Sequence, residues 1–505
     1  MRIDVFSHSF MVTELSDRQN HATKQFIRTL IQYEPVVTEG RKEMVPARVF
    51  ASTNEDREYF RFHINMFSEF LERLRFEQIP DRDVQQHHHK FEVREDSKIE
   101  HIVKFLHNPR DTQPDIIDYI KADGDNKVVT LQPGGGKTLI AKHCIADFGV
   151  RTACIMRGSF IDRWVPDLED TFELKRGELL VIRGSQSLNA LMEMALEGDE
   201  LGKIIMISIN TFTNYIKDFE KQGASEQYPI PPGYFFEKLG IPFGIFDEAH
   251  QFPHQVMKMF SYMHIGKFLS LSATLNTQDK FMNSMYEVMY PRGTRFDGGK
   301  FNAFVVAASI KYSLKVPNSI RCKGFQGAYS HTTFEASLMV RKNKRLLDNY
   351  LALISWAVKE NFTDVMIKGQ KAIVFCGTIN FCTLVQKHLQ ALHPHLKVVR
   401  YVSKDKMSVM DSADIIVSTV LSAGTAVDIV GLRYNLLTTA IDSQQSNEQT
   451  MGRTRVLKDW PGTDVVFHYF VCDGIEKHMK YDMNKREYFR GRVKSHGTVM
   501  APISV

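Results

Sequence analysis

Cysteine, tryptophan and long apolar runs are all scarce in this 505-residue chain. It has six cysteines and three tryptophans. No two cysteines form a Cys-x-x-Cys pair, which argues against a zinc ribbon or a disulfide framework and fits a reducing compartment. No uninterrupted apolar stretch could span a bilayer, and Met1–Val5 lacks the apolar core of a signal peptide. We therefore expect a cytoplasmic protein without a membrane partner.

A strong charge imbalance is also absent. The chain has 64 Lys and Arg against 59 Asp and Glu, a formal net charge of +5. Such a balance neither requires nor excludes a nucleic-acid partner, so local motifs must decide. At 505 residues, with 43% apolar residues, the chain is expected to form two or three domains.

Two patterns of alternation divide the chain. In residues 1–95, short strands and helices alternate without any phosphate-binding signal, which predicts a small α+β accessory domain. From about residue 100, apolar strands alternate with helices, as in a parallel sheet covered on both faces. We therefore predict an α/β protein with two tandem doubly wound domains, residues 96–335 and 336–505. The first is expected to end in an irregular insert, and the second in a helix.

A glycine-rich turn, Gly134-Gly135-Gly136-Lys137-Thr138, follows an apolar run. Such a turn between a strand and a helix points backbone N–H groups at a phosphate chain. Lys137 adds a point charge for the β/γ oxygens, and the Thr138 hydroxyl can ligate Mg²⁺. The turn predicts a phosphate-binding loop with Mg²⁺ as cofactor. The alternative is a degenerate loop that matches the motif in sequence but no longer binds phosphate.

An acidic motif, Asp247-Glu248-Ala249-His250, follows a second apolar run, residues 243–246. One carboxylate, Asp247, can hold the metal, and Glu248 can orient or deprotonate a water. Together the two motifs predict hydrolysis of a nucleoside triphosphate. The role of His250 is open from the residues alone, because a histidine after a carboxylate pair could also belong to the core.

Further motifs follow at plausible spacings. They are residues 110–113, 156–164, 208–211, 272–274, 422–428 and 449–455. As an ordered set, with the phosphate loop and a DEAH-type acidic motif, they resemble superfamily 2 helicases, which have two RecA-like domains. The resemblance covers about residues 105–475. The N-terminal domain, opening with residues 3–8, and the basic segment 341–344 are most similar to phage UvsW-type helicases, which remodel branched DNA.

The resemblance implies that ATP binds between the two RecA-like domains. Gln113 would read the adenine edge, although it could also be a solvent-facing residue that opens a helix. His250 would link the γ-phosphate to residues 272–274, coupling hydrolysis to domain closure. Asp428 would lie on the nucleotide side. One residue departs from the family pattern, since Ala426 stands where a glycine is usual.

The same resemblance places an arginine finger at Arg453. Gln449 and Arg453 are four residues apart, so a helix through both would present them on one side. Gln449 has a structural alternative, because residues 446–449 have the form of a capping box. Val456 stands where a second arginine is usual, and Arg455 comes one residue early, which leaves its nucleotide contact in doubt.

Polar residues near strand ends are the candidate strand contacts, although each could equally be a satisfied turn residue. They are Arg157, Ser159, Asn210, Thr211, Ser403 and Thr419. Contacts of this kind fix position on phosphates without reading sequence. The UvsW-type resemblance further implies a duplex-binding N-terminal domain, a branched or duplex DNA partner and, for a phage protein, the host cytoplasm and recombination, repair or replication proteins.

The leading hypothesis is therefore an ATP-dependent DNA helicase or translocase that unwinds or branch-migrates forked DNA. An RNA helicase of the same superfamily is one alternative, because backbone contacts dominate in both. A protein in which ATP merely clamps nucleic acid is another. A nuclease motor subunit has little support, since no nuclease constellation lies outside the ATP motifs.

Overall fold

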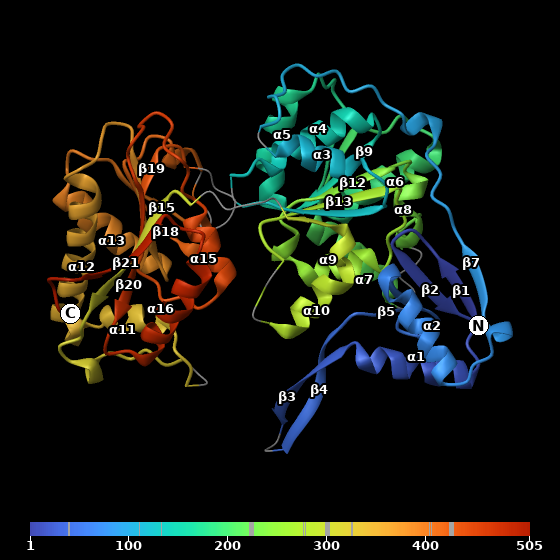
Figure 1. Cartoon of the computed structure of the whole chain (residues 1–505), viewed down its shortest axis with the longest axis horizontal. Coiled ribbons are helices and arrows are strands. Elements are labelled where there is room, and N and C mark those ends of the chain that lie inside the picture. Colours follow the sequence, from blue (N-terminus) through green and yellow to red (C-terminus); the bar gives the residue numbers. More distant parts are fainter. Residues whose placement is uncertain are drawn as a thin grey trace. The chain divides into compact units, whose positions relative to one another are not determined.

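The computed structural model describes residues 1–38, 41–110, 112–132, 134–221, 227–275, 277, 279–297, 303–324, 327–402, 405, 407–423 and 429–505. The chain divides into two compact units, unit 1 (Met1–Gly299) and unit 2 (Lys300–Val505) (Figure 1). None of the helices within these described ranges combines the length and apolarity needed to cross a bilayer.

Unit 1 opens with a five-stranded mixed sheet in the order β5-β6-β2-β1-β7. Its strands are β1 (Arg2–Val5), β2 (Ser9–Thr13), β5 (Ser52–Thr53), β6 (Phe60–His63) and β7 (Gln85–His88). Helices α1 (Asp17–Thr29) and α2 (Phe67–Phe76) cover it, and a hairpin of β3 (Ile31–Thr38) and β4 (Arg41–Val49) extends from it (Figure 1). Phe10, Phe26, Phe62 and Phe70 pack together in its core at ring-centroid distances of 5.0–5.6 Å. The small α+β domain is thus confirmed.

This N-terminal sheet packs directly on the rest of unit 1. The Ser7 hydroxyl accepts a hydrogen bond from the Ile265 N–H at 2.9 Å, and the Ser9 hydroxyl donates to the Met263 carbonyl at 3.1 Å. One hydrophobic cluster continues from its phenylalanines into the parallel sheet. The N-terminal sheet is therefore an integral layer of unit 1.

The larger sheet of unit 1 has seven parallel strands in the order β10-β11-β9-β12-β13-β8-β14. The strands are β8 (Asn126–Thr130), β9 (Thr152–Met156), β10 (Leu179–Ile182), β11 (Ile204–Ser208), β12 (Phe243–Phe246), β13 (Lys267–Ser272) and β14 (Arg295–Asp297). The helices are α3 (Gln113–Lys121), α4 (Lys137–Phe148), α5 (Gly158–Thr171), α6 (Ser185–Glu197), α7 (Ile209–Glu220), α8 (Phe235–Lys238), α9 (Pro253–Phe260) and α10 (Lys280–Met289). Because all seven strands are parallel, the loops after them gather at one edge.

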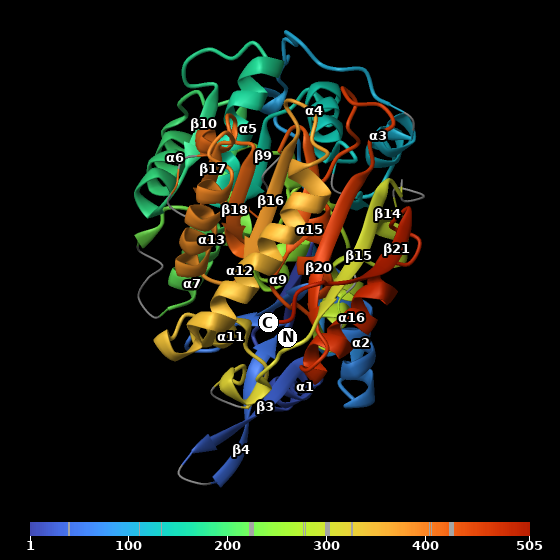
Figure 2. The same cartoon turned by 90° about the vertical axis from the view of Figure 1, so that its left-hand side faces the viewer.

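Unit 2 repeats this architecture, with the parallel order β17-β18-β16-β19-β20-β15-β21 (Figure 2). Its strands are β15 (Val305–Tyr312), β16 (Lys371–Cys376), β17 (Val398–Tyr401), β18 (Ile415–Thr419), β19 (Leu432–Leu437), β20 (Val465–Cys472) and β21 (Ser495–Met500). Its helices are α11 (His331–Leu338), α12 (Lys344–Val358), α13 (Ile379–Leu392), α14 (Val420–Ala423), α15 (Gln444–Met451) and α16 (Glu476–Phe489). Along β16, Val374 belongs to one hydrophobic cluster while Ile373 and Phe375 belong to another. Both faces of the sheet are thus covered, which confirms two tandem RecA-like domains.

Two expectations about organisation need correction. The boundary at residue 335 is wrong, because β15 pairs with β20 along its whole length and belongs to unit 2. The second domain does not end in its helix, since α16 is followed by β21, which pairs with β15. In each case the expectation failed because a strand pairs with another strand that is distant in sequence.

Candidate nucleotide site

The phosphate loop joins the end of β8 to the start of α4. Gly134 and Gly136 adopt φ of +82° and +83°, a left-handed conformation that side chains rarely tolerate. A Cβ on Gly136 would also lie 2.2 Å from Gln113 Nε2. Glycine is therefore required twice, and the loop closes tightly onto the N-terminus of α4, where free N–H groups favour an anion.

Gln113 holds this loop. Its Nε2 donates to the Gly135 carbonyl at 3.0 Å, and its Oε1 accepts from the Arg110 N–H at 2.8 Å. The side chain is buried, so the solvent-facing alternative is wrong. The contact with adenine stays a prediction.

The two carboxylates of the acidic motif follow β12. Lys137 Nζ lies 2.8 Å from Glu248 Oε1, so the phosphate loop and the acidic motif meet in an ion pair. Glu248 has φ +56° and ψ +46°, which is unusual for a residue with a Cβ. Strain of this kind concentrates at functional sites. The structure therefore brings the two sequence motifs together at the carboxyl edge of the sheet.

Asp247 is buried, and its two oxygens differ in their contacts. Oδ2 accepts a hydrogen bond from Trp164 Nε1 at 3.1 Å. Within the described part of the chain, buried Oδ1 has no hydrogen-bond partner. Burial, together with the Glu248 charge, raises the pKa of Asp247 to about 6. Such an oxygen fits a cation ligand.

Mg²⁺ fits this arrangement. Asp247 Oδ1 and the Thr138 hydroxyl are hard oxygen donors, and Mg²⁺ binds one or two protein ligands while keeping waters and substrate phosphates. The described residues contain no cluster of three or more His, Cys, Asp or Glu that could hold a metal alone. When bound, the ion would neutralise phosphate charge. Asp247 and Thr138 would hold it.

His250 connects the acidic motif to the segment after β13. Its Nδ1 lies 3.0 Å from Ser272 Oγ and 3.3 Å from Glu248 Oε2. The Ala273 N–H donates to the same nitrogen at 3.3 Å. Burial lowers the pKa of His250 to about 4, so its ring is neutral at neutral pH. The contact that the helicase resemblance implies is thus present, and its coupling role stays a prediction.

The predicted strand contacts of unit 1 lie at the same edge of the sheet. Arg157 and Ser159 begin α5 after β9, and Asn210 and Thr211 begin α7 after β11, the neighbouring strand. The first three are exposed. The Thr211 hydroxyl instead accepts from the Gly184 N–H at 2.8 Å and is buried. Thr211 therefore supports the surface, and the other three can meet a ligand.

In unit 2, Thr419 ends β18 and is largely buried, with its hydroxyl 2.7 Å from Ser422 Oγ. Ser403 and Asp428, like Ala426, lie outside the described residues. The strand-contact role of Thr419 and the roles of Ser403 and Asp428 remain predictions.

The predicted helix through Gln449 and Arg453 is shorter than expected. α15 starts after Ser443, whose hydroxyl accepts from the Ser446 N–H, so a capping box at 446–449 is wrong. The helix ends at Met451, and Arg453 lies beyond it, with Nε donating to the Gln449 carbonyl at 3.3 Å. Arg455 Nη1 donates to the Thr454 carbonyl at 2.9 Å. The finger and the second-arginine roles remain predictions.

Trp164 is a site residue that the sequence did not reveal. It lies in the middle of α5 and is 4% exposed. A tryptophan eight residues after a strand has the spacing of a core residue, and nothing local marks its indole N–H as a donor to Asp247. Trp164 could have been predicted as a partner of Asp247 only by knowing that β9 and β12 are neighbouring strands.

No family model and no curated protein matches this sequence. The structure of S. cerevisiae Dbp5 bound to RNA and ADP BeF3 is similar, with a TM-score of 0.51 and 10% identity, covering 78% of this chain and 90% of that chain. A Dbp5 variant bound to a Gle1 variant and IP6 has a TM-score of 0.48 and 12% identity, covering 78% and 89%. The first likeness shows the fold, which is that of two tandem parallel-sheet α/β domains.

Proposed function

We propose that this protein is an ATP-driven helicase or translocase that moves along nucleic acid. The observation that carries this proposal is the meeting of the phosphate loop and the acidic motif, where Lys137 lies 2.8 Å from Glu248 beside buried Asp247. Hydrolysis of a phosphate chain needs a cation, a metal-holding carboxylate and a base close together. The edge of the unit 1 sheet supplies all three.

Each residue has a defined task in this proposal. The loop N–H groups and Lys137 bind the β and γ phosphates, which compete with Glu248 for the ammonium. Glu248, once released, orients the attacking water and accepts its proton. His250 passes the state of the γ-phosphate to Ser272. Arg453, with Gln449, keeps the role that the family resemblance implies, compensation of charge on the transferred phosphoryl group.

The substrate follows from two different observations. The small N-terminal domain and the motif set resemble UvsW-type helicases, which favours branched DNA. The similar structure of Dbp5 is bound to RNA, which favours single-stranded RNA as the second candidate. Exposed Arg157, Ser159 and Asn210 serve either substrate, because contacts to phosphates carry no sequence information.

A comparison of nucleic acids tests the substrate. ATPase activity and strand separation are measured with a four-way DNA junction, a forked duplex, plain duplex DNA and single-stranded RNA. We expect the junction and the fork to stimulate hydrolysis most. Stimulation by RNA alone would replace the DNA proposal with the RNA one, and ATP binding without any stimulated hydrolysis would favour the nucleotide-gated clamp.

Glu248→Gln tests whether hydrolysis drives the motor. The amide cannot accept the proton of water, so we expect hydrolysis to fall by about 10²–10⁴-fold while ATP binding persists. Strand separation should be lost with it. Glu193→Gln, on the exposed surface of α6, is the matched control. Undiminished strand separation by Glu248→Gln would contradict the proposal.

A further inference from the structure

Helix α5 has an exposed N-terminus and, further along, a buried contact with the nucleotide site. Its N-terminus presents Arg157 and Ser159, which are exposed at the strand-contact edge. Two turns later, Trp164 Nε1 donates to Asp247 Oδ2 at 3.1 Å. A single helix thus touches both the proposed nucleic-acid surface and the carboxylate that would hold Mg²⁺.

The contact fixes which oxygen of Asp247 remains available. Trp164 and Asp247 are both nearly inaccessible, at 4% and 7% exposure. The indole N–H takes one acceptor position of Oδ2, whereas Oδ1 has no hydrogen-bond partner among the residues described, so Oδ1 is the oxygen more open to a cation. A hydrogen-bond donor beside a metal ligand orients that ligand, and its loss commonly weakens metal binding by about 10–100-fold.

Helix α5 also contains a proline close to Trp164. Pro166 lies inside the helix and removes the N–H that would bond the Asp162 carbonyl, which weakens the turn that contains Trp164. The residues on either side are tied to different elements. Asp162 pairs with Arg183 at 2.6 Å, after β10, whereas Asp167 pairs with Lys142 at 2.5 Å, on the phosphate-loop helix α4.

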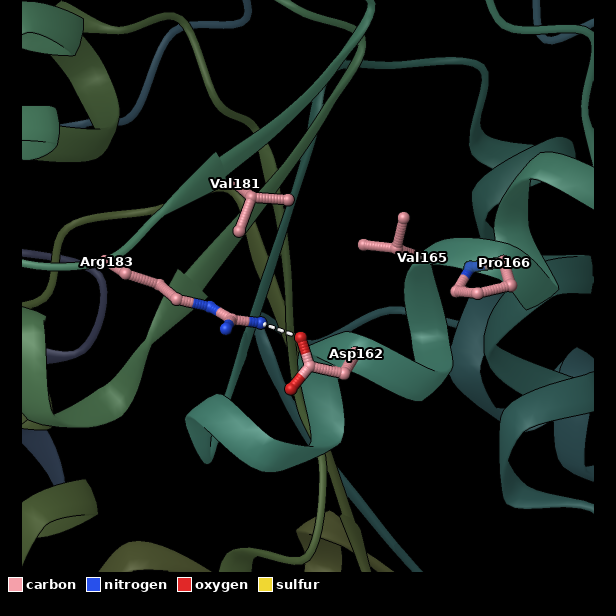
Figure 3. Close-up of a pocket in the computed structure, with 5 residues that line it drawn as sticks. All are labelled: Asp162, Val165, Pro166, Val181 and Arg183. Carbon is pink, nitrogen blue, oxygen red and sulfur yellow. Dashed lines mark hydrogen bonds and ion pairs between the residues drawn. The ribbon is translucent and has the colours of Figure 1, made fainter. Parts of the chain in front are cut away.

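Figure 3 shows the Asp162–Arg183 pair across a pocket that is also lined by Val165, Pro166 and Val181. The pocket leaves open space between the middle of α5 and the edge strand β10. The first half of α5, which holds the exposed end, is therefore followed by a weakened turn that has room beside it.

We propose that Trp164 is a positioning residue that relays contact of nucleic acid with the N-terminus of α5 to the carboxylate of Asp247. A phosphate bound at Arg157 and Ser159 shifts the first half of α5. Trp164 moves with it and, through its hydrogen bond, sets the orientation of the Asp247 carboxylate that binding of Mg²⁺–nucleotide requires. This inference rests on the proposed function and names the path by which nucleic acid stimulates hydrolysis.

The first test measures binding rather than turnover. Fluorescent mant-ADP is titrated with Mg²⁺ on the full chain and on Trp164→Phe, which keeps an aromatic ring but lacks the N–H. We expect the Mg²⁺ concentration for half-maximal binding to rise about tenfold. Trp356→Phe, on α12 of unit 2, is the matched control and should not change it.

A second variant separates the hydrogen bond from packing. In a chain carrying Trp356→Phe and Trp460→Phe, residue 164 is replaced by β-(3-benzothienyl)alanine, which has nearly the shape of tryptophan without a donor. The same rise in the Mg²⁺ requirement is expected. An unchanged requirement in this isosteric variant would overturn the inference even where Trp164→Phe fails to fold.

The relay itself is tested by stimulation. We expect the ratio of stimulated to basal ATPase to fall about fivefold in Trp164→Phe, with nucleotide-free nucleic-acid affinity unchanged. A weaker Mg²⁺ affinity with a normal stimulation ratio would overturn the relay. If the unmodified chain binds mant-ADP with Mg²⁺ but nucleic acid never stimulates hydrolysis, the proposed function fails, while the link from Trp164 to Asp247 is still judged by the binding test.

Discussion

Glu248 and Asp247 show at the scale of single residues how the site departs from ordinary structure. Glu248 is one of only four non-glycine residues with positive φ within the described ranges, the others being Glu14, Arg57 and Gln78. Asp247 is ionisable yet buried. Both features cost folding free energy, and both place a carboxylate where a phosphate chain and a cation would offset that cost.

The burial of Asp247 predicts a pH-dependent stability. Its folded pKa of about 6 lies above the ordinary 3.8, so the folded protein binds this proton more tightly than the unfolded chain does. The resulting stability is present below 3.8 and lost as pH rises through 6. Asp247→Asn, which cannot ionise, should therefore stabilise unit 1 at pH 8 by up to about 3 kcal/mol.

Calorimetric unfolding in EDTA checks this prediction. The stabilisation by Asp247→Asn should shrink as the pH falls through 6 and be smallest near pH 4. Asp170→Asn, an exposed position on α5, is the control and should show no such trend. An Asp247→Asn variant that is less stable than the unmodified chain at pH 8 would show that the carboxylate is stabilised by its neighbours.

At the scale of elements, short local signals decide where helices begin and end. α15 begins directly after the cap residue Ser443 and ends at Met451, with Gly452 following. Arg453 therefore sits in the turn after the helix, tied to the Gln449 carbonyl, and is 8% exposed. A turn residue held in this way keeps a defined position without helical periodicity.

Arg453→Ala tests the finger on this element. Loss of its charge should lower the rate constant of stimulated ATP hydrolysis by about a thousandfold while nucleotide affinity changes little, because the charge acts on the transition state. Arg453→Lys should restore only part of the rate, since lysine lacks the planar fork. Arg490→Ala, on an exposed side chain after α16, is the control. Equal losses in rate and in ATP binding would point to a structural role.

At the scale of the molecule, the N-terminal sheet and the first parallel sheet form one body. Buried Arg61 lies over the rings of Phe6 and Tyr262, with its guanidinium carbon 5.5 Å and 4.7 Å from their centroids. A Cβ on Gly233 would lie 2.7 Å from Arg61 Nη2, so this glycine makes room for it. Removal of residues 1–95 would therefore expose a core surface of unit 1.

The same interface predicts sensitivity to acid. Burial lowers the pKa of His8 to about 3, beside His63 and His264, and its Nε2 lies 3.2 Å from the Asp125 carbonyl. The folded pKa lies below the ordinary 6.5, so the neutral ring stabilises unit 1 above pH 6.5, and this is lost as the pH falls toward 3. At pH 4.5 the free energy of unfolding lost through His8 is about 3 kcal/mol.

His8→Gln checks this share, because the amide can still donate to the Asp125 carbonyl but does not titrate. Denaturant unfolding of unit 1 should lose less free energy between pH 7 and pH 4.5 in this variant than in the unmodified chain. The exposed His87→Gln on β7 serves as the control and should leave the pH dependence unchanged. Identical pH dependence in all three proteins would contradict a buried, neutral His8.

Much of the fold could be predicted because its signals are local. The alternation of strands and helices is present both in residues 1–95 and after residue 100, since apolar spacing within each segment decides it. The boundary at 335 failed because nothing within Val305–Tyr312 tells a strand which sheet it will join. The same holds for the site. Lys137 and Glu248 were predicted from local motifs, whereas Trp164 was missed because its contact with Asp247 joins distant segments.

The sequence by itself determined the chemistry of the nucleotide loop and acidic motif, because consecutive residues define a strand, a tight turn and a helix N-terminus. It also determined two parallel-sheet domains, through repeated alternation of apolar strands and helices. Only the tertiary structure decided that β15 belongs to unit 2, that the N-terminal sheet shares the core of unit 1, and that Trp164 donates to Asp247. These are contacts between segments far apart in the chain, and the packing that selects them depends on the whole sheet.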